Sequence, residues 1–207
     1  MPVIPTGWTG LVPQPASSTA RFAAGWTSTG LYFYAEIDTT ERVASTNDAS
    51  LHCGDSLEIF VDDNGTFLNP PAYDARGTRQ FVIAAPNGNE STSKRAATWL
   101  LGQSGGLWTG QYTSLSSATG FTVEALVDAR DLGIDAWALQ SGGLVGIDLA
   151  VNVGGGSDPS CPRLGQYAFR TAAIPAFPAV APEGCVAPWC NTDAFCKPEL
   201  RPRSPSR

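Results

Sequence analysis

The sequence predicts an all-β fold, an antiparallel β-sandwich of the jelly-roll or immunoglobulin-like kind with a disulfide-bearing C-terminal tail. Short runs rich in aromatic and β-branched residues recur along the 207 residues, separated by clusters of Gly, Pro, Asn and Asp. Within these runs apolar and polar residues alternate with the period of two that is typical of a strand. No long window shows the 3.6-residue period of a helix, so helices are expected to be minor.

The first half of the chain contains three clear strand patterns. Strands are expected over 21–26 and 30–38, and the second is aromatic and bounded by turn residues. Residues 39–54 are polar and are expected to form a loop. A strand over 56–62 follows, and Asp62-Asp63-Asn64-Gly65 has the composition of a turn.

The second half is expected to supply the remaining strands and one helical turn. Residues 87–119 are rich in Gly, Ser and Thr and are expected to hold only weak strands. Asp128 suits a helix N-cap and Gly133 a helix stop, which predicts a single helical turn between them. Further strands are expected over 79–85, 121–127, 144–153 and 165–170.

These patterns predict one domain with two irregular ends. Residues 1–20 are expected to form a lead-in or linker, 21–180 the sandwich, and 181–207 a Cys-containing tail with a disordered end. No signal peptide or membrane span is visible in the sequence. We therefore expect a mature fragment, or a domain cut from a longer exported precursor.

Charge excludes some classes of partner. The net charge is −6, with only 13 Lys and Arg residues, several of them in the tail. Nucleic-acid binding needs clustered cations that displace counterions from phosphate, so nucleic acid is not an expected partner. The same shortage of cations, and the absence of a long apolar run, predict no membrane insertion.

Cysteine usage indicates an oxidising compartment. The chain has five cysteines, Cys53, Cys161, Cys185, Cys190 and Cys196, and a single histidine, His52. Zinc sites usually combine short C-x2-C pairs or His ligands, so disulfides are favoured over a metal site. Disulfides predict a secreted or cell-surface protein. Because five is odd, one thiol is left free or is available for self-association between chains.

Alternation assigns the strand residues to faces. In the strand over 56–62, Leu57, Ile59 and Val61 suit the core, and Glu58 lies on the opposite, outer or concave face. If the strands are neighbours, several polar residues share that face: Glu58, Gln80, Glu124, Asp148 and Asn152. Such a face suits a ligand with many hydroxyl groups, and the simpler alternative is a row of solvated outward side chains.

Taken in order, these runs resemble the strands of family 9 carbohydrate-binding modules, part of a broader group of sandwiches that includes the DOMON domains. The most specific similarity is the run Gly-Asp-Ser-Leu-Glu-Ile-Phe-Val-Asp at 54–62. Weaker similarities cover Trp26 with 30–38, Gln80-Phe81, 120–125 and 146–152. Order and spacing agree over about residues 21–153.

The resemblance implies a sugar site with an aromatic clamp above polar side chains. The family's central glutamate matches Glu58, and its late-strand asparagine matches Asn152. The first clamp aromatic falls on His52, while the loop expected to carry the second, residues 154–161, has no aromatic. A glutamine and an arginine of the family's site fall on Ala150 and Val82. These departures predict a ligand and a binding mode that differ from the family's own.

The resemblance also predicts a disulfide. Cys53 lies in the first clamp loop and Cys161 in the second, and these loops face each other across the family's site. A Cys53–Cys161 bond is therefore expected. The three tail cysteines would then leave one over.

We expect non-catalytic binding of a poly- or oligosaccharide by an exported module. Glu58, Asn152 and Gln80 would hydrogen-bond sugar hydroxyls, and His52 or Trp108 would supply the flat surface. The alternative is a structural or adhesive surface domain with a decayed sugar site.

An enzyme is not expected. A glycosidase needs paired carboxylates, and strand alternation already explains those present. No cofactor or metal is expected, apart from a structural calcium ion at Asp62-Asp63-Asn64-Gly65, where a plain turn is favoured.

Overall fold

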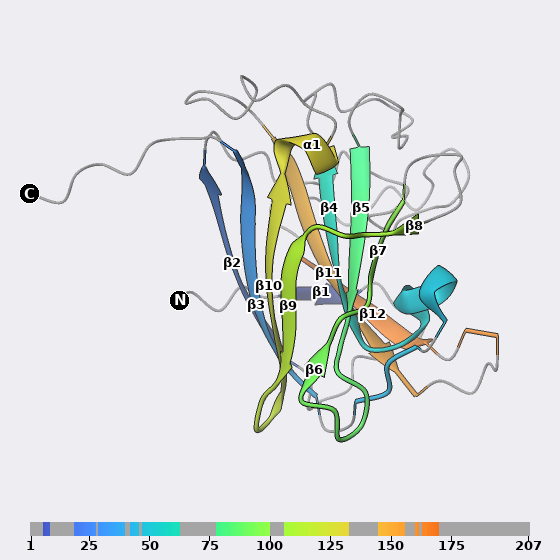
Figure 1. Cartoon of the computed structure of the whole chain (residues 1–207). Coiled ribbons are helices and arrows are strands. Elements are labelled where there is room, and N and C mark those ends of the chain that lie inside the picture. The colour runs from blue at the N-terminus through green and yellow to red at the C-terminus, as the bar shows by residue number, and fades with distance from the viewer. Residues whose placement is uncertain are drawn as a thin grey trace, which may run out of the picture.

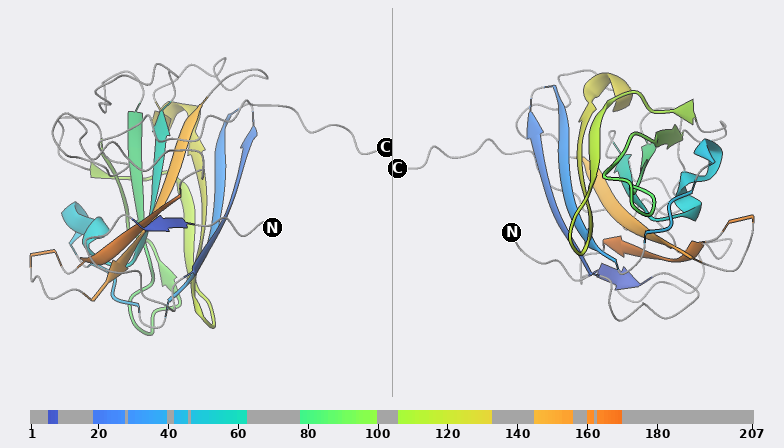
Figure 2. Two further views of the ribbon diagram at one scale, coloured as in Figure 1. Left: turned by 180° about the vertical axis from the view of Figure 1, so that it is seen from behind. Right: turned by 60° about the horizontal axis from the view of Figure 1, so that its bottom comes forward.

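Two antiparallel sheets pack face to face as a sandwich in the computed structural model of the chain (Figure 1). The structure describes residues 6–8, 19–27, 29–39, 42–45, 47–62, 78–99, 106–132, 145–155, 160–161 and 163–169. Views from behind and from below show the same two layers (Figure 2). The predicted all-β sandwich is thus confirmed.

Seven strands form one sheet and five form the other. The seven-stranded sheet consists, in spatial order, of β1 (Thr6–Trp8), β12 (Arg163–Phe169), β11 (Gly146–Gly154), β4 (Ser56–Asp62), β5 (Thr78–Ala84), β7 (Ala96–Trp99) and β8 (Gly106–Leu107). The five-stranded sheet consists of β2 (Thr19–Thr27), β3 (Gly30–Asp38), β10 (Gly120–Asp128), β9 (Gln111–Ser116) and β6 (Thr92–Ser93). The expected weak strands of 87–119 are β6 to β9.

The core lies between the sheets and is built by the predicted alternation. Leu57, Ile59 and Val61 of β4 are fully buried there with aromatic residues of the facing sheet, Phe33 and Phe121. Burying a side chain of this size contributes about 1.5–3 kcal/mol to folding, so these inward rows fix how the sheets stack.

Two short helices interrupt the strands. Helix α1 (Ala129–Leu132) begins as predicted after Asp128, whose Oδ1 accepts the backbone N–H of Asp131 at 2.9 Å. The 3-10 helix η1 (Asp48–Cys53) lies in the stretch expected to be a loop, and Asn47 caps it by accepting the N–H of Ala49 at 3.0 Å. Leu51 of η1 packs on the outer face of the seven-stranded sheet, against Val82, Ala84 and Ala97. The apolar contact of Leu51 holds the helical turn of this otherwise polar segment against the sheet.

Part of the expected lead-in belongs to the sandwich. Thr6–Trp8 forms β1 and pairs with β12 at the edge of the seven-stranded sheet. The domain boundaries at residues 20 and 180 stay predictions, and the tail with Cys185, Cys190 and Cys196 lies outside the described residues, as do Asp63, Asn64 and Gly65. Within the part of the chain that the structure describes, no helix is long and apolar enough to cross a membrane.

Candidate functional site

The candidate site lies on the outer face of the seven-stranded sheet, where β4, β5, β11 and β12 run side by side. The register pairs Asn152 with both Ser56 and Gln166, and pairs Glu58 with Ala150. Directly paired residues project to the same face of a sheet. The polar side chains of these strands are therefore brought together on the face away from the core.

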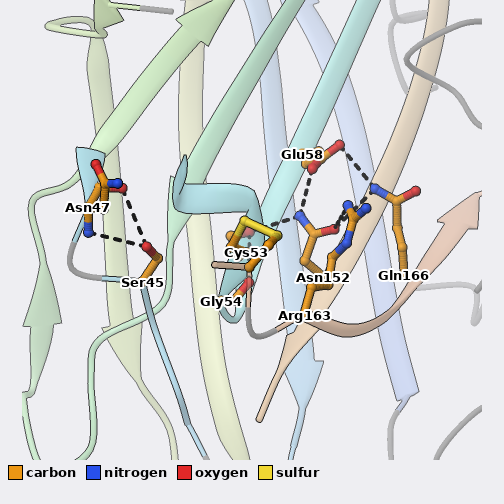
Figure 3. The surroundings of a disulfide bond; sticks show 10 residues. Ser45, Asn47, Cys53, Gly54, Glu58, Asn152, Arg163 and Gln166 are labelled. Atoms are coloured by element: carbon orange, nitrogen blue, oxygen red, sulfur yellow. Dashed lines mark hydrogen bonds between the residues drawn. A yellow bond between two sulfur atoms is a disulfide. The ribbon is translucent and has the colours of Figure 1, made fainter. Parts of the chain in front are cut away.

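Glu58 is the centre of this cluster. Its Oε1 accepts a hydrogen bond from Asn152 Nδ2 at 2.7 Å, and its Oε2 accepts one from Gln166 Nε2 at 3.1 Å (Figure 3). The same Oε2 also accepts from Gln80 Nε2 at 3.1 Å. Three side-chain amides from three different strands thus donate to one carboxylate. We call Ser56, Glu58, Gln80, Asn152, Arg163 and Gln166 the polar cluster.

Asn152 links Glu58 to the rest of the polar cluster. Its Nδ2 also donates to Ser56 Oγ at 2.9 Å, while its Oδ1 accepts from Arg163 Nη1 at 3.2 Å and from Gln166 Nε2 at 3.1 Å. Because the guanidinium can only donate, it fixes the amide with the oxygen toward Arg163 and the nitrogen toward Glu58. The orientation of every member therefore depends on its neighbours.

The electrostatics of the cluster follow from burial. Glu58 is only 1% exposed, Asn152 is fully buried and Gln166 is 3% exposed. Burial raises the pKa of the Glu58 carboxyl, and the hydrogen bond from Asn152, the Arg163 charge and the amides of Gln80 and Gln166 oppose that rise. A buried carboxylate is costly unless donors satisfy it, so these partners are needed to keep Glu58 in place.

His52 and Arg163 lie at the more open side of the cluster, and both are half-buried. Burial, followed by the positive charge of Arg163, lowers the pKa of His52. The imidazole is therefore neutral near pH 7, and it can both donate and accept a hydrogen bond.

The predicted disulfide is present and anchors this region. Cys53 at the end of η1 is bonded to Cys161, which precedes β12 and its first residue, Arg163 (Figure 3). The bond holds η1, and with it His52, against the strand that supplies Arg163 and Gln166. Cys53, Cys161 and His52 place three potential metal ligands within 4.8 Å of one another, but the thiolates that a metal needs are consumed by the disulfide.

The Gly54-Asp55 pair at the start of the specific motif has a structural role. Asp55 is buried, and its two oxygens accept the backbone N–H groups of Val43 and Gly154, the latter at 3.1 Å. A Cβ on Gly54 would lie 2.1 Å from the backbone nitrogen of Ser45, so no larger residue fits there. The pair, which directly precedes β4, therefore joins residues 42–45 to the end of β11. Burial raises the Asp55 pKa to about 6 despite these hydrogen bonds.

The structure unites most of the predicted site residues. Gln80 and Asn152 both donate hydrogen bonds to Glu58, and His52 lies beside the disulfide at the edge of the same cluster. The expectation that Glu124 joins them is wrong, because β10 lies in the other sheet.

The expectation that Trp108 offers a flat surface to a sugar is also wrong. Trp108 is 5% exposed and belongs to the core between the sheets. Its ring packs against Phe81 and Tyr112, with centroids 4.9 and 5.3 Å away, and its Nε1 donates to Asp131 Oδ2 at 3.0 Å. A half-buried partner for the indole N–H, supplied by α1, satisfies the polar group of this aromatic residue at the edge of the core.

Three members of the cluster were missed as site residues by the sequence reasoning, Ser56, Arg163 and Gln166. Arg163 and Gln166 lie on β12, which was expected as a strand over 165–170 but without a partner. Alternation within 163–169 could have placed Gln166 on one face with Ala168, but only the pairing of β12 with β11 shows that this face carries Asn152.

Comparisons with known proteins agree with this architecture. The family described as carbohydrate family 9 binding domain-like matches residues 3–160. Among solved structures, a family 9 carbohydrate-binding module from Caldicellulosiruptor kristjanssonii in complex with cellotriose is 19% identical, with a TM-score of 0.57, and the match covers 99% of this chain and 91% of that chain. A module of that family from the same organism in complex with glucose is 18% identical, with a TM-score of 0.55 and coverage of 99% and 87%.

At these identities the two structures establish the fold alone, while the family match spans most of the chain. The comparison with curated proteins gives no match. The matched region contains the central motif, the members of the polar cluster on β4, β5 and β11, and Cys53 of the disulfide, whereas Arg163 and Gln166 lie beyond it. The chain therefore belongs to the carbohydrate family 9 binding domain-like family, whose members are non-catalytic carbohydrate-binding modules.

Proposed function

We propose that this chain is an exported, non-catalytic module that binds a neutral sugar at the polar cluster, with His52 as the flat surface beside it. The observation that carries the proposal is the convergence of two amides, Gln80 and Gln166, and the Arg163 guanidinium on the Glu58–Asn152 pair. Sugars present many hydroxyl groups that both donate and accept, and mixed amide and carboxylate groups match them.

The half-buried members of the cluster are the ones that meet the sugar. Gln80 donates one hydrogen bond to Glu58 and keeps its amide oxygen for a hydroxyl donor. Arg163 extends from Asn152 toward the more open side, where His52 lies. Glu58 and Asn152 are too deeply buried to be the first point of contact, so they orient the Gln80 amide and the Arg163 guanidinium.

Glucose and cellotriose are the first ligands to test, because the two related modules were solved with them. A glycan array and isothermal titration should show binding to the wild-type protein. Glu58→Gln keeps the shape of the side chain but replaces one acceptor oxygen with an NH2 group. If that group takes the place of Oε2, it faces the N–H donors of Gln80 and Gln166 and cannot accept from them. We expect the affinity to fall by about tenfold or more.

Glu90→Gln is the matched control, because Glu90 is an exposed carboxylate that accepts the N–H of Asn87 in a turn. It should bind sugars as the wild type does. Equal sugar affinity of the Glu58→Gln and Glu90→Gln variants would contradict the site assignment.

Export is supported by the Cys53–Cys161 disulfide, because such bonds persist in oxidising compartments. A panel of polysaccharide hydrolysis assays tests the absence of catalysis. Release of reducing sugar that disappears in a cluster variant would contradict the non-catalytic assignment.

A structural or adhesive domain is the second candidate, and one observation favours it. Glu58, Asn152 and Gln166 are closed off from solvent by their own network, as expected of a sugar site that has become structural. A glycan array without hits, together with disulfide-linked multimers on a non-reducing gel, would support this alternative over sugar binding.

A further inference from the structure

The outer face of the five-stranded sheet carries two tyrosines, of which Tyr32 is exposed and Tyr34 is half-buried. Tyr32, Tyr34 and Glu36 follow one another on the outward side of β3, and Tyr32 is 38% exposed. On β10 the paired residues are Leu126, Glu124 and Thr122. This five-stranded face is the outer side of the layer at the left of Figure 1.

Small residues leave room beside the tyrosines. Gly25 is paired with Tyr32 and Ala23 with Tyr34, on the neighbouring strand β2. Among the described residues, a Cβ placed on Gly25 would meet no atom within 4 Å, so the space beside Gly25 is open to them. A flat ligand can therefore reach the faces of the rings without displacing a side chain.

Carboxylates lie beside both tyrosines. The Tyr34 hydroxyl donates to Glu36 Oε1 at 2.9 Å. Burial, followed by the negative charge of Glu124, raises the pKa of Tyr32. Each carboxylate can accept hydrogen bonds from a ligand, and a ring fixed as that of Tyr34 is loses little freedom when a ligand stacks on it.

A shallow hollow adjoins Tyr32. Its volume is about 250 Å³, and Tyr32, Gln111, Thr113, Glu124 and Leu126 are among its lining residues. This is below the roughly 300–1,000 Å³ of pockets that enclose a small ligand, so an occupant lies across the face rather than inside it.

Charge limits the chemistry of the occupant. Arg21, the one cation of β2, has its Nη1 atom 3.6 Å from Glu36 Oε2 and 3.7 Å from Asp38 Oδ2, so its charge is paired with two carboxylates. Glu124 adds a third carboxylate to this face. The excess of negative charge disfavours anionic polymers. A neutral sugar suits the carboxylates and the tyrosines, because its hydroxyl groups can donate to carboxylates and the C–H faces of its rings can stack on tyrosine.

We propose that this five-stranded face is a second carbohydrate-binding surface, which takes the interior of a neutral polysaccharide chain lying across β3, β10 and β9, with sugar rings stacked on Tyr32 and Tyr34. The face is open on the β2 side, so a chain end is not required. The surface is separate from the polar cluster, which lies on the opposite side of the sandwich.

Native gels that contain hydroxyethyl cellulose or glucomannan test this proposal. The wild type should be retarded, and Tyr32→Ala/Tyr34→Ala should raise the dissociation constant by about tenfold or more. Leu107→Ala is the matched control, because it removes a 64% exposed apolar side chain from β8 of the other sheet. It should migrate as the wild type does.

Glucose titration distinguishes this surface from the polar cluster. The tyrosine variant should keep its glucose affinity, while Glu58→Gln should lose glucose affinity and keep its retardation by polysaccharide. In the wild type, cellohexaose should shift the backbone amide signals of 32–36 and 122–126, a readout that needs no variant to fold.

Unchanged retardation of the tyrosine variant would overturn the proposal, as would an absence of these amide shifts. A wild type that neither polysaccharide retards would overturn it too. Binding of polylysine that depends on the tyrosines, without polysaccharide binding, would show instead that the face docks a cationic protein.

Discussion

The outer faces of the two sheets follow the same strand alternation, yet they differ in what surrounds their polar side chains. On the seven-stranded sheet, Glu58 and Asn152 are buried, and each is held by several hydrogen bonds. On the five-stranded sheet, Glu124 is exposed, and Tyr32 is 38% exposed. Alternation therefore decides which face a residue occupies, while the elements that lie over the face decide its chemistry.

The covering elements account for the difference. Helix η1 packs on the seven-stranded sheet through Leu51, and the disulfide fastens its end to the start of β12. A carboxylate beneath such a cover must be matched by donors, whereas an exposed one is solvated by water. The first arrangement gives a pre-oriented site of fixed shape, and the second gives an open surface.

Removing the disulfide should have the largest effect on the comparison. The bond closes a loop of 108 residues, so Cys53→Ala/Cys161→Ala should lower the free energy of unfolding by about 4 kcal/mol, as urea unfolding would measure. The change in the folded structure should be confined to the side that η1 covers, so the amide signals of Tyr32 and Glu124 should stay unchanged. An unfolding midpoint equal to that of the wild type would show that the bond does not anchor the cover.

Removing the carboxylate from each face should give the next largest contrast. Glu58→Ala leaves the donors of Gln80, Asn152 and Gln166 without their shared acceptor, and should cost about 3 kcal/mol of unfolding free energy. Glu124→Ala on the exposed face should change the same quantity by less than about 0.5 kcal/mol. Similar values for the two variants would remove the physical distinction between the faces.

The pH dependence of stability should sharpen the comparison further. Burial raises the Asp55 pKa in the folded protein to about 6, above its ordinary value of 3.8. The folded state therefore binds the proton more tightly than the unfolded state, so the contribution of Asp55 to stability is largest near pH 4. It falls as the pH rises through the window from about 4 to 6, by on the order of 2–3 kcal/mol.

Urea unfolding at pH 4, 5, 6 and 7 measures this slope. Asp55→Asn is the comparison, because the amide does not titrate and the variant should lose that part of the pH dependence. The same slope in the wild type and in Asp55→Asn would assign it to other groups.

Much of the fold could be predicted because each strand carries its own signal. The bounds of β3 and β4 were predicted as they are observed, and the inward rows such as Leu57, Ile59 and Val61 are in the core. The short strands of 87–119 and β1 have too few residues for a period to show. Their existence depends on pairing with strands distant in the sequence.

The site was harder to predict for the same reason. Glu58 and Asn152 were found through the resemblance, but Arg163 and Gln166 join them only because β12 lies next to β11. Trp108 was assigned to the site because its segment reads as irregular, whereas half-buried Asp131 on α1 accepts its indole N–H and the ring lies in the core. No pattern in the sequence shows which outer face η1 covers.

The central claim is that a sugar binds at the polar cluster of the covered face. A titration of isotope-labelled protein with glucose, followed through the side-chain amide signals of Gln80, Asn152 and Gln166, tests it most directly. The account predicts saturable shifts of these signals, largest for the half-buried Gln80, with the backbone amides of β3 unmoved. Saturable glucose binding that leaves all three side-chain amides unchanged would contradict it.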